Sequence, residues 1–579
     1  MRECMRTVGF CLLLISSLSA DEPALRRSDV VFMYQAGRSV YEEYGATVLA
    51  WGGKPTPQSK ADAEAAGVRF FGSVGMVTEF ASYYRRFPDS YEDGLCRNVD
   101  GQPVKVPWLT DHEHDGVPFW WCCTQQPQFR QYLKERVVET VKAGADGVHI
   151  DDHLGTAGGL WLGTCLCQRC VEGFRAHLKT LPNEALRKHG IENADTYDYR
   201  DALRQWRSTS GSTPNRSVQQ HPLWNEWCVY QGRAAAAFMM ELRALAASTA
   251  GRPVPIGANA GLLWPRHLAD YRALDLFSAE TDHHAAERRF SDDPLFAYRL
   301  AEAVERPYSA TASGGDWAFV KEHEVPGQVR GWIALSYAAG QCFMAPHRQW
   351  CYTPEKGTHW YSGPAEKFAP LYRFVRAHSD WFDGYTTYAD VAVVMPHRSY
   401  LKDSRRWVQM GNRLAEANVS YRLLLAGDEL VDHPLSAEMV QACPVLLIPE
   451  RDEFLPADRE LLERETAGRR VFASVSELLS DVKPAVQSTP SDVVRVLPRV
   501  GQGSAVVHLL NYAYDAARDD VQALDDVQVR LDLDALGVPK AAGCTLLAPD
   551  APPQSLSVVD GVVSVPKLHL WALLKFAPP

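Results

Sequence analysis

The chain has 579 residues, of which 46% are hydrophobic and 23% charged, and its formal net charge at pH 7 is -11. A chain of this length exceeds one compact hydrophobic core, so we expect two or three domains, at least one of them large. The acidic balance argues against nucleic acid and against an anionic membrane as partners.

The first twenty residues have the pattern of a secretory signal peptide. Arg2 and Arg6 precede the apolar run Val8 to Ile15, and small residues follow up to Ala20. An apolar run of this length is too short to cross a bilayer. We therefore expect removal of residues 1–20 and a secreted or periplasmic protein, with no membrane partner.

A barrel is predicted for residues 21–384. Short β-type runs alternate there with longer amphipathic stretches, which is typical of a parallel sheet covered by helices. The clearest helix spans residues 127–142, where apolar residues recur at helical spacing before Gly144. The eight predicted strands are Ala46–Trp51, Val68–Val74, Val117–Cys122, Gly147–Asp152, Val254–Ala258, Leu274–Glu280, Pro307–Ala312 and Gln341–Ala345.

Two smaller units are predicted after the barrel. The strand Asp390–Met395 and the helices and strands that follow it predict a small open α/β domain of the flavodoxin or amidotransferase type over residues 385–485. Short strands separated by turn residues predict a C-terminal β-sandwich over residues 486–579. The predicted fold class is therefore α/β, a (β/α)8 TIM barrel followed by an α/β domain and a β-sandwich.

Carboxylates end two of the predicted barrel strands. Asp151 and Asp152 end the fourth run, and Glu280 ends the sixth. The carboxyl ends of barrel strands face the active site, where paired carboxylates divide into a proton donor and a charge stabiliser. Alternatively, one Asp caps the following segment or pairs with an Arg, and Glu280 orients a neighbouring His. We predict Asp151, Asp152 and Glu280 as catalytic residues.

Three cysteines, Cys165, Cys167 and Cys170, lie within six residues. A tetrahedral zinc site needs a fourth ligand, which the upstream pair Cys122 and Cys123 would supply. The alternative is a disulfide between Cys123 and one member of the triplet, which export would allow. Three closely spaced thiolates are hard to satisfy with one bridge, so the spacing favours zinc.

These motifs resemble glycoside hydrolase family 42, the retaining β-galactosidases, and related hypothetical glycosyl hydrolases. Similar segments are the triplet followed by Val171–Arg175, residues 123–130, Val254–Asn259 and Gly331–Gly340. The domain order is similar too, with an α/β trimerisation-type domain and a small β-sandwich after the barrel. The resemblance implies a carbohydrate substrate, a homo-oligomer that is a trimer in that family, and a structural zinc ion held by Cys123, Cys165, Cys167 and Cys170.

The chain departs from this family at the nucleophile. The family's acid/base position on the fourth strand falls on Asp151 and Asp152, but its nucleophilic Glu falls within Tyr308–Ser313, which contains no carboxylate. A retaining enzyme needs a nucleophile about 5 Å from the acid. Either Asp151 or Asp152 is then the nucleophile, with Glu280 or, less favourably, Asp282 as acid/base, or the activity has been lost.

The leading hypothesis is an exported glycoside hydrolase that cleaves a glycosidic bond in an oligo- or polysaccharide. The alternative is a catalytically inactive barrel protein that binds glycans. No glycine-rich phosphate loop is present, so we expect no organic cofactor. Aromatic rings suit sugar rings, and Asp316 is a third carboxylate near the seventh strand. The residues predicted to bind substrate are Trp120, Trp121, His153, Trp161, Asp282, His283, Asp316 and Trp317.

Overall fold

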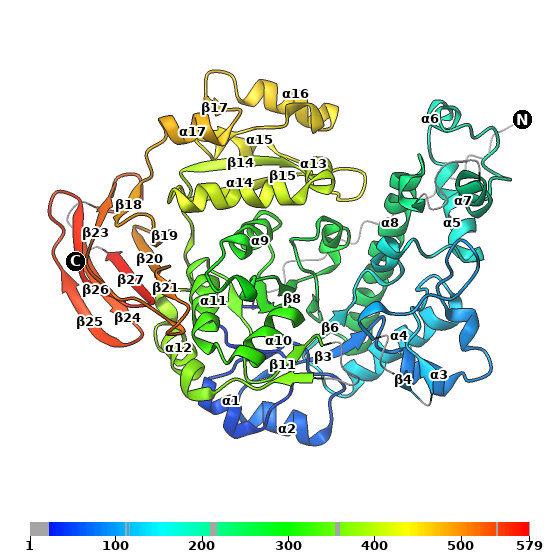
Figure 1. Ribbon diagram of the computed structural model, residues 1–579, viewed down its shortest axis with the longest axis horizontal. Coiled ribbons are helices and arrows are strands. Elements are labelled where there is room, and N and C mark those ends of the chain that lie inside the picture. Colours follow the sequence, from blue (N-terminus) through cyan, green and yellow to red (C-terminus); the bar gives the residue numbers. More distant parts are fainter. Residues whose placement is uncertain are drawn as a thin grey trace, which may run out of the picture.

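The computed structural model describes residues 23–109, 113–114, 116–208, 217–353, 359–539 and 542–577. The predicted signal peptide lies outside these residues. A central barrel is flanked by an α/β domain, by a β-sandwich and, on the side opposite the sandwich, by a third part, which we call the cysteine-rich lobe (Figure 1). The helices of this lobe include α3 (Phe80–Arg86), α5 (Gln168–Leu178), α6 (Asn183–Lys188) and α7 (Tyr199–Ser208). None of the helices in these ranges has the length and apolarity that crossing a bilayer requires.

The barrel sheet confirms the predicted (β/α)8 fold. Eight parallel strands follow the order β1-β2-β3-β6-β7-β8-β9-β10. A parallel bridge between Phe32 and Ala345 joins the first strand to the last and closes the barrel. The strands are β1 (Val31–Phe32), β2 (Val48–Leu49), β3 (Arg69–Gly75), β6 (Gly147–Asp151), β7 (Ile256–Ala258), β8 (Leu276–Thr281), β9 (Tyr308–Ala312) and β10 (Cys342–Phe343).

One predicted barrel strand was wrong. In the run Val117–Cys122 only β5 (Val117–Pro118) is a strand, and it pairs with β4 (Glu113–His114) in a separate hairpin. The rest of that run makes antiparallel bridges with the flanking lobe. The first barrel strand is instead β1, which is too short to show a strand pattern in the sequence. Because one strand was missed and one was added, β6 is still the fourth barrel strand and β8 the sixth.

The helices around the barrel follow from local sequence signals. Helix α4 (Pro127–Lys142) has the predicted bounds, because Pro127 suits a first helical position and Gly144 takes a positive φ of 91° beyond its end. Its buried face includes Phe129, Leu133 and Val137. Other barrel helices are α1 (Arg38–Tyr44), α2 (Pro57–Ala65), α8 (Trp224–Ala250), α9 (Asp293–Ala303), α10 (Gly314–His323), α11 (Pro326–Ala338) and α12 (Ala365–Ala377).

The α/β domain packs against the barrel through α14 (Ser404–Glu416), which lies between the domain's sheet and α9 (Figure 1). Gly411 allows this close approach, since a Cβ there would lie 2.9 Å from the Phe296 ring of α9 and 2.5 Å from the Tyr421 hydroxyl. The sheet is parallel in the order β15-β14-β16-β17. Its strands are β14 (Val391–Pro396), β15 (Tyr421–Ala426), β16 (Val445–Leu447) and β17 (Arg470–Phe472), and its other main helices are α16 (Pro456–Glu465) and α17 (Val475–Asp481).

The C-terminal part forms the predicted β-sandwich. A sheet in the order β13-β19-β20-β27-β24-β25 faces one in the order β18-β23-β26. Inward residues such as Val507, Val529 and Leu574 share one apolar core. The strands are β13 (Thr386–Thr387), β18 (Val486–Thr489), β19 (Val494–Gly501), β20 (Ser504–Asn511), β23 (Leu524–Leu531), β24 (Gly543–Ala548), β25 (Ala551–Leu556), β26 (Val562–Leu568) and β27 (Trp571–Ala577).

A buried arginine joins the sandwich to the barrel. Arg499 on β19 is only 1% exposed, and it donates to the carbonyl oxygens of Ala339 at 2.7 Å and Tyr385 at 2.8 Å. The carboxylate of Glu302 on α9 lies 3.5 Å from its guanidinium. Burial lowers the pKa of Arg499 to about 10, although Glu302 opposes this. The guanidinium is therefore held in the core by several acceptors at once.

We expect Arg499→Met to lower the free energy of unfolding by about 3 kcal/mol, because it leaves buried acceptors without their donor. Urea unfolding followed by fluorescence measures this loss. The control is Arg464→Met, which removes an exposed side chain paired only with its neighbour Glu465 and should change stability by less than about 0.5 kcal/mol. Equal losses in the two variants would contradict the role of Arg499.

Candidate active site and metal centre

One amide joins two carboxylates at the mouth of the barrel. Asp151 ends β6, Glu280 lies near the end of β8, and Asn259 follows β7 between them. Nδ2 of Asn259 donates to Oδ1 of Asp151 at 3.1 Å and to Oε2 of Glu280 at 3.3 Å. Its Oδ1 accepts from the backbone N–H of Glu280 at 3.1 Å. Because Oδ1 of Asp151 and Oε2 of Glu280 accept from the same nitrogen, the distance between them cannot exceed the two donor–acceptor distances added together.

The two carboxylates differ in how well they hold a negative charge. Burial, followed by the charges of Asp151 and Asp316, raises the pKa of Glu280 to about 7. Burial also raises the pKa of Asp151, but the donors from Asn259 and from the backbone N–H of Asp152, at 3.0 Å, oppose it. Near neutral pH the arrangement can therefore offer a proton on Glu280 beside an anion on Asp151.

Asp152 belongs to the same electrostatic cluster. Its φ of 50° lies in the left-handed region, where the chain turns just after β6. Burial and the charges of Asp151 and Glu280 hold its pKa well above the usual range. The structure thus brings the three predicted catalytic residues together.

An aromatic group that sequence reasoning missed borders this cluster. Tyr34 follows β1, and burial followed by the charges of Glu280 and Asp151 raises the pKa of its hydroxyl. Its ring makes edge contacts with Trp360 at 4.9 Å and with Trp51 at 6.2 Å between centroids. The one sequence signal for Tyr34 was its place after an apolar run, which was too short to identify as a strand.

A cleft of about 1000 Å³ opens beside Glu280. Trp264, which is 69% exposed, and Trp350 on β11 (Gln349–Cys351) line it together with Asp282. Sequence reasoning missed both tryptophans and also gave no role to Asn259. All three follow the ends of barrel strands, and that position was the available signal.

Two predicted sugar platforms are core residues instead. Trp121 is 2% exposed, and its Nε1 donates to the Gly155 carbonyl at 3.1 Å. Trp317 is 1% exposed, donates to the Thr311 hydroxyl at 3.0 Å and stacks on Tyr361. Neither ring has a face free for a sugar, because packing covers both. These two predictions are therefore corrected.

Two predicted substrate-binding histidines also lie in the core. His153 is buried, with Nδ1 2.8 Å from the carboxylate of Asp270. His283 is buried and donates from Nδ1 to the Thr281 carbonyl at 2.7 Å. Their placement corrects the prediction that they contact substrate. Asp282 lines the cleft, Trp120 packs against the barrel core, and Trp161 is 56% exposed, so the substrate contacts of these three residues stay predictions.

Asp316 is a structural cap and cannot replace the missing nucleophile. Its carboxylate accepts the backbone N–H groups of His283 at 2.9 Å and Ala285 at 2.7 Å, and the Ser313 hydroxyl at 2.8 Å. It also forms a capping box at the start of α10. Both oxygens are therefore engaged in holding the loop after β8, and the charge of Asp316 adds to burial in raising the pKa values of Glu280 and Asp282.

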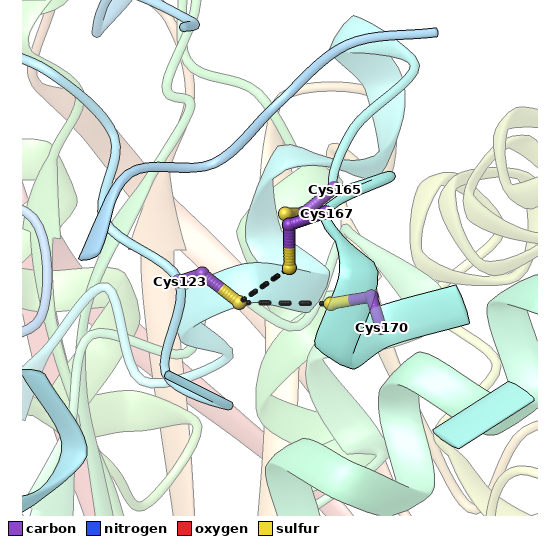
Figure 2. A group of neighbouring side chains, drawn as sticks. All are labelled: Cys123, Cys165, Cys167 and Cys170. Atoms are coloured by element: carbon purple, nitrogen blue, oxygen red, sulfur yellow. Dashed lines mark hydrogen bonds between the residues drawn. The ribbon is translucent and has the colours of Figure 1, made fainter. Parts of the chain in front are cut away.

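Four buried cysteines form a group that could hold a metal ion (Figure 2). The ligand atoms of Cys123, Cys165, Cys167 and Cys170 all lie within 4.8 Å of one another. Sγ of Cys123 is 3.8 Å from that of Cys167 and 3.6 Å from that of Cys170. Thiolates around a tetrahedral ion with metal–sulfur bonds of about 2.3 Å lie about 3.8 Å apart, whereas a disulfide needs about 2.05 Å. The spacing fits a metal centre.

The surroundings of these sulfur atoms favour thiolates. Cys167 is the N-cap of α5 (Gln168–Leu178), and Cys170 lies in its first turn, where the helix dipole stabilises negative charge. The backbone N–H of Arg97 approaches Sγ of Cys165 at 3.4 Å, and the Thr156 hydroxyl approaches Sγ of Cys123 at 3.5 Å. Cys122, the other member of the upstream pair, belongs to the barrel core instead.

A closed (β/α)8 barrel with facing carboxylates at the ends of its strands is an arrangement that glycoside hydrolases use. An alpha-agarase from Thalassotalea agarivorans is 24% identical over 601 residues, which cover 95% of this chain and 40% of that protein. An alpha-agarase from Alteromonas agarilytica is 23% identical over 616 residues, with shares of 95% and 41%. The chain thus spans about two fifths of the length of these relatives. No family model matches the chain.

Solved glycoside hydrolase structures share the fold. The beta-galactosidase from Bacillus circulans sp. alkalophilus has a TM-score of 0.64 at 14% identity, covering 95% of this chain and 99% of its own. The alpha-L-fucosidase isoenzyme 2 from Paenibacillus thiaminolyticus has a TM-score of 0.60 at 12% identity, with shares of 96% and 100%. At these identities the likeness concerns the fold alone, and membership of family 42 stays a prediction.

Proposed function

We propose that the protein is an exported glycoside hydrolase that cleaves an agar-type polysaccharide, with Asp151 and Glu280 as its catalytic pair. The observation that carries the proposal is the shared hydrogen bonding of Asn259 to both carboxylates. The names of the two agarase relatives support the class of substrate. An inactive glycan-binding barrel is not favoured, since such a protein would have no need for buried, facing carboxylates with raised pKa values.

The roles follow from the environments of the two groups. Glu280, with a pKa of about 7, protonates the leaving oxygen. Asp151, which accepts two N–H donors, attacks the anomeric carbon and forms a glycosyl ester. The ester removes the negative charge that raised the pKa of Glu280, so Glu280 then accepts a proton from the incoming water. The short separation of the pair favours this retaining route, in which carboxyl groups lie about 5 Å apart.

This assignment also accounts for the missing nucleophile on the seventh strand. Strand β9 contains no carboxylate, and Asp316 beyond it is engaged as a cap. The fourth strand therefore supplies the nucleophile and the sixth supplies the acid. Burial and the charges of Asp151 and Glu280 raise the pKa of Asp152, so this third carboxyl group is held in its neutral form beside the pair.

Two variants separate the acid from the nucleophile. Glu280→Gln should lower kcat on agarose oligosaccharides by about 10²–10⁴, but much less on a dinitrophenyl glycoside, whose leaving group needs no proton. Asp151→Asn should lose activity on both substrates. The control is Glu322→Gln, an exposed carboxylate on α10 outside the cleft lining. If Glu280→Gln were impaired equally on both substrates, Glu280 would not be the acid.

The pH profile should show Glu280 as the group that must be protonated. Because its pKa is raised to about 7, the proton is lost as the pH rises through that value. We expect kcat/KM to fall tenfold per pH unit above about 7. Steady-state rates between pH 5 and pH 9 measure this limb. A flat profile up to pH 9 would contradict the assignment.

We propose that the four-cysteine centre holds a structural zinc ion. Four thiolates at tetrahedral spacing suit zinc, which in closed sites of this kind has no exchangeable position and contributes to folding. Its ligands come from the segment before α4 and from both sides of the start of α5. The ion would therefore staple the cysteine-rich lobe to the barrel.

We expect one zinc ion per chain in the purified protein, lost in Cys167→Ser together with a marked fall in Tm. Plasma emission spectroscopy and thermal unfolding measure the two effects. The control is Cys228→Ser, a buried cysteine on α8 outside the ligand group, which should keep its zinc. A mass spectrum that showed a disulfide within the group would overturn the proposal.

A further inference from the structure

We infer that helix α14 of the α/β domain forms the far wall of an extended subsite for a neutral polysaccharide chain, which starts at Glu280 and passes over Trp264 and Trp350. The inference rests on the proposed function and assigns the binding of the substrate chain beyond the bond that is cleaved. The described part of the cleft runs from Glu280 across the loop between β8 and α9 to the exposed side of α14.

The cleft is larger than a single sugar requires. Its volume of about 1000 Å³ lies at the upper end of sites for small molecules, which measure about 300–1,000 Å³. It is continuous with Glu280 rather than separate from it. A chain whose scissile bond lies at the catalytic pair would therefore extend its neighbouring sugars into this space.

Two tryptophans offer flat faces along this path. Trp264 is 69% exposed, although a large apolar side chain usually avoids water. Trp350 is partly exposed, and its ring is held in place against Gly314, where a Cβ would lie only 2.3 Å away. Aromatic rings bury the apolar faces of sugars. The pair is therefore suited to act as stacking platforms along the cleft.

The α14 wall carries hydrogen-bonding groups that are still available. Arg405 and Gln409 line the cleft and are exposed, and within the ranges that the structure describes their side chains have no polar partner. Arg406, the next residue, instead pairs with Glu450 away from the cleft lining. The free donors on the cleft side can therefore bind sugar hydroxyl groups.

A hydrogen-bonded link holds this wall to the loop that follows β8, the strand of the proposed acid. Asp293 accepts from Nδ2 of Asn412 on α14 at 2.5 Å and from Nε2 of His284 at 2.9 Å. The hydrogen bond to Asp293 raises the pKa of His284 to about 9, so the ion pair persists at neutral pH. Helix α14 and the loop after β8 are thereby held at a fixed spacing.

The charges around the cleft favour a neutral chain. The cleft lining contains more acidic than basic side chains. The acidic ones are Glu280, Asp282, Glu287, Asp292, Asp293 and Glu416, and the basic ones are Arg289, Arg405, Arg495 and His284. Arg289 is paired with Glu287, and Arg495 with Asp292 at 3.0 Å. A single unpaired guanidinium cannot offset this excess of carboxylates, so a sulfated chain would be repelled.

The test is calorimetric binding of a neutral agarose disaccharide and octasaccharide to the Glu280→Gln protein, in which turnover is slowed by the loss of the acid. In that background Trp264→Ala and the double variant Arg405→Ala/Gln409→Ala should each lower the octasaccharide affinity by about tenfold and reduce its ratio to the disaccharide affinity. The control is Arg406→Ala, which should leave this ratio unchanged. A sulfated octasaccharide should bind at least tenfold more weakly than the neutral one.

Each outcome has one meaning. Loss of the length dependence in the cleft variants alone supports the inference. An unchanged ratio in those variants, while the wild-type protein cleaves agarose, overturns the inference and leaves the proposed function intact. Tighter binding of the sulfated octasaccharide than of the neutral one overturns the inference that the subsite takes a neutral chain. Absence of binding and of cleavage with every neutral chain overturns the inference and the proposed function together.

Discussion

Closure of the parallel barrel is the constraint on which the rest of the site depends. The bridge between Phe32 and Ala345 closes the sheet, so the carboxyl ends of β6, β7 and β8 come to lie side by side. Only then can one Asn259 amide donate to carboxylates that are 129 positions apart in the chain. The same closeness lets the charge of Asp151 add to burial in raising the pKa of Glu280, since like charges in a poorly solvated site disfavour ionisation. The different proton affinities of Asp151 and Glu280 therefore follow from the way in which the barrel packs their side chains together.

The domains around the barrel have separate physical tasks. The cysteine-rich lobe contains four thiols at metal-binding spacing, where a bound ion would form a local cross-link in a segment with few regular strands. The sandwich is anchored by a buried guanidinium with several acceptors. The α/β domain is packed through α14, where Gly411 removes the side chain that would have kept the helices apart. That close contact also places an exposed row of α14 residues at the edge of the catalytic cleft.

Local signals explain what could be predicted and what could not. Helix α4 was predictable because its apolar spacing, Pro127 and Gly144 all lie within its own segment. Strand β1 was not, because two residues cannot show a period. The capping role of Asp316 had a local signal, since Ser313 stands three residues before it. For the tryptophans, a position after a barrel strand did not distinguish core from cleft, because Trp317 is buried and Trp264 is exposed although both follow barrel strands.

The sequence by itself determined the types of elements, their order, the carboxylates at the ends of β6 and β8, and the close spacing of the cysteine triplet. These properties depend on neighbours within a few residues, so periodicity and spacing reveal them. Tertiary structure alone decided that Asn259 joins the two carboxylates, that Asp316 is a cap, and which aromatic rings face the cleft. Burial, hydrogen-bond partners and pKa values depend on side chains contributed by distant segments, and the local sequence carries no record of that packing.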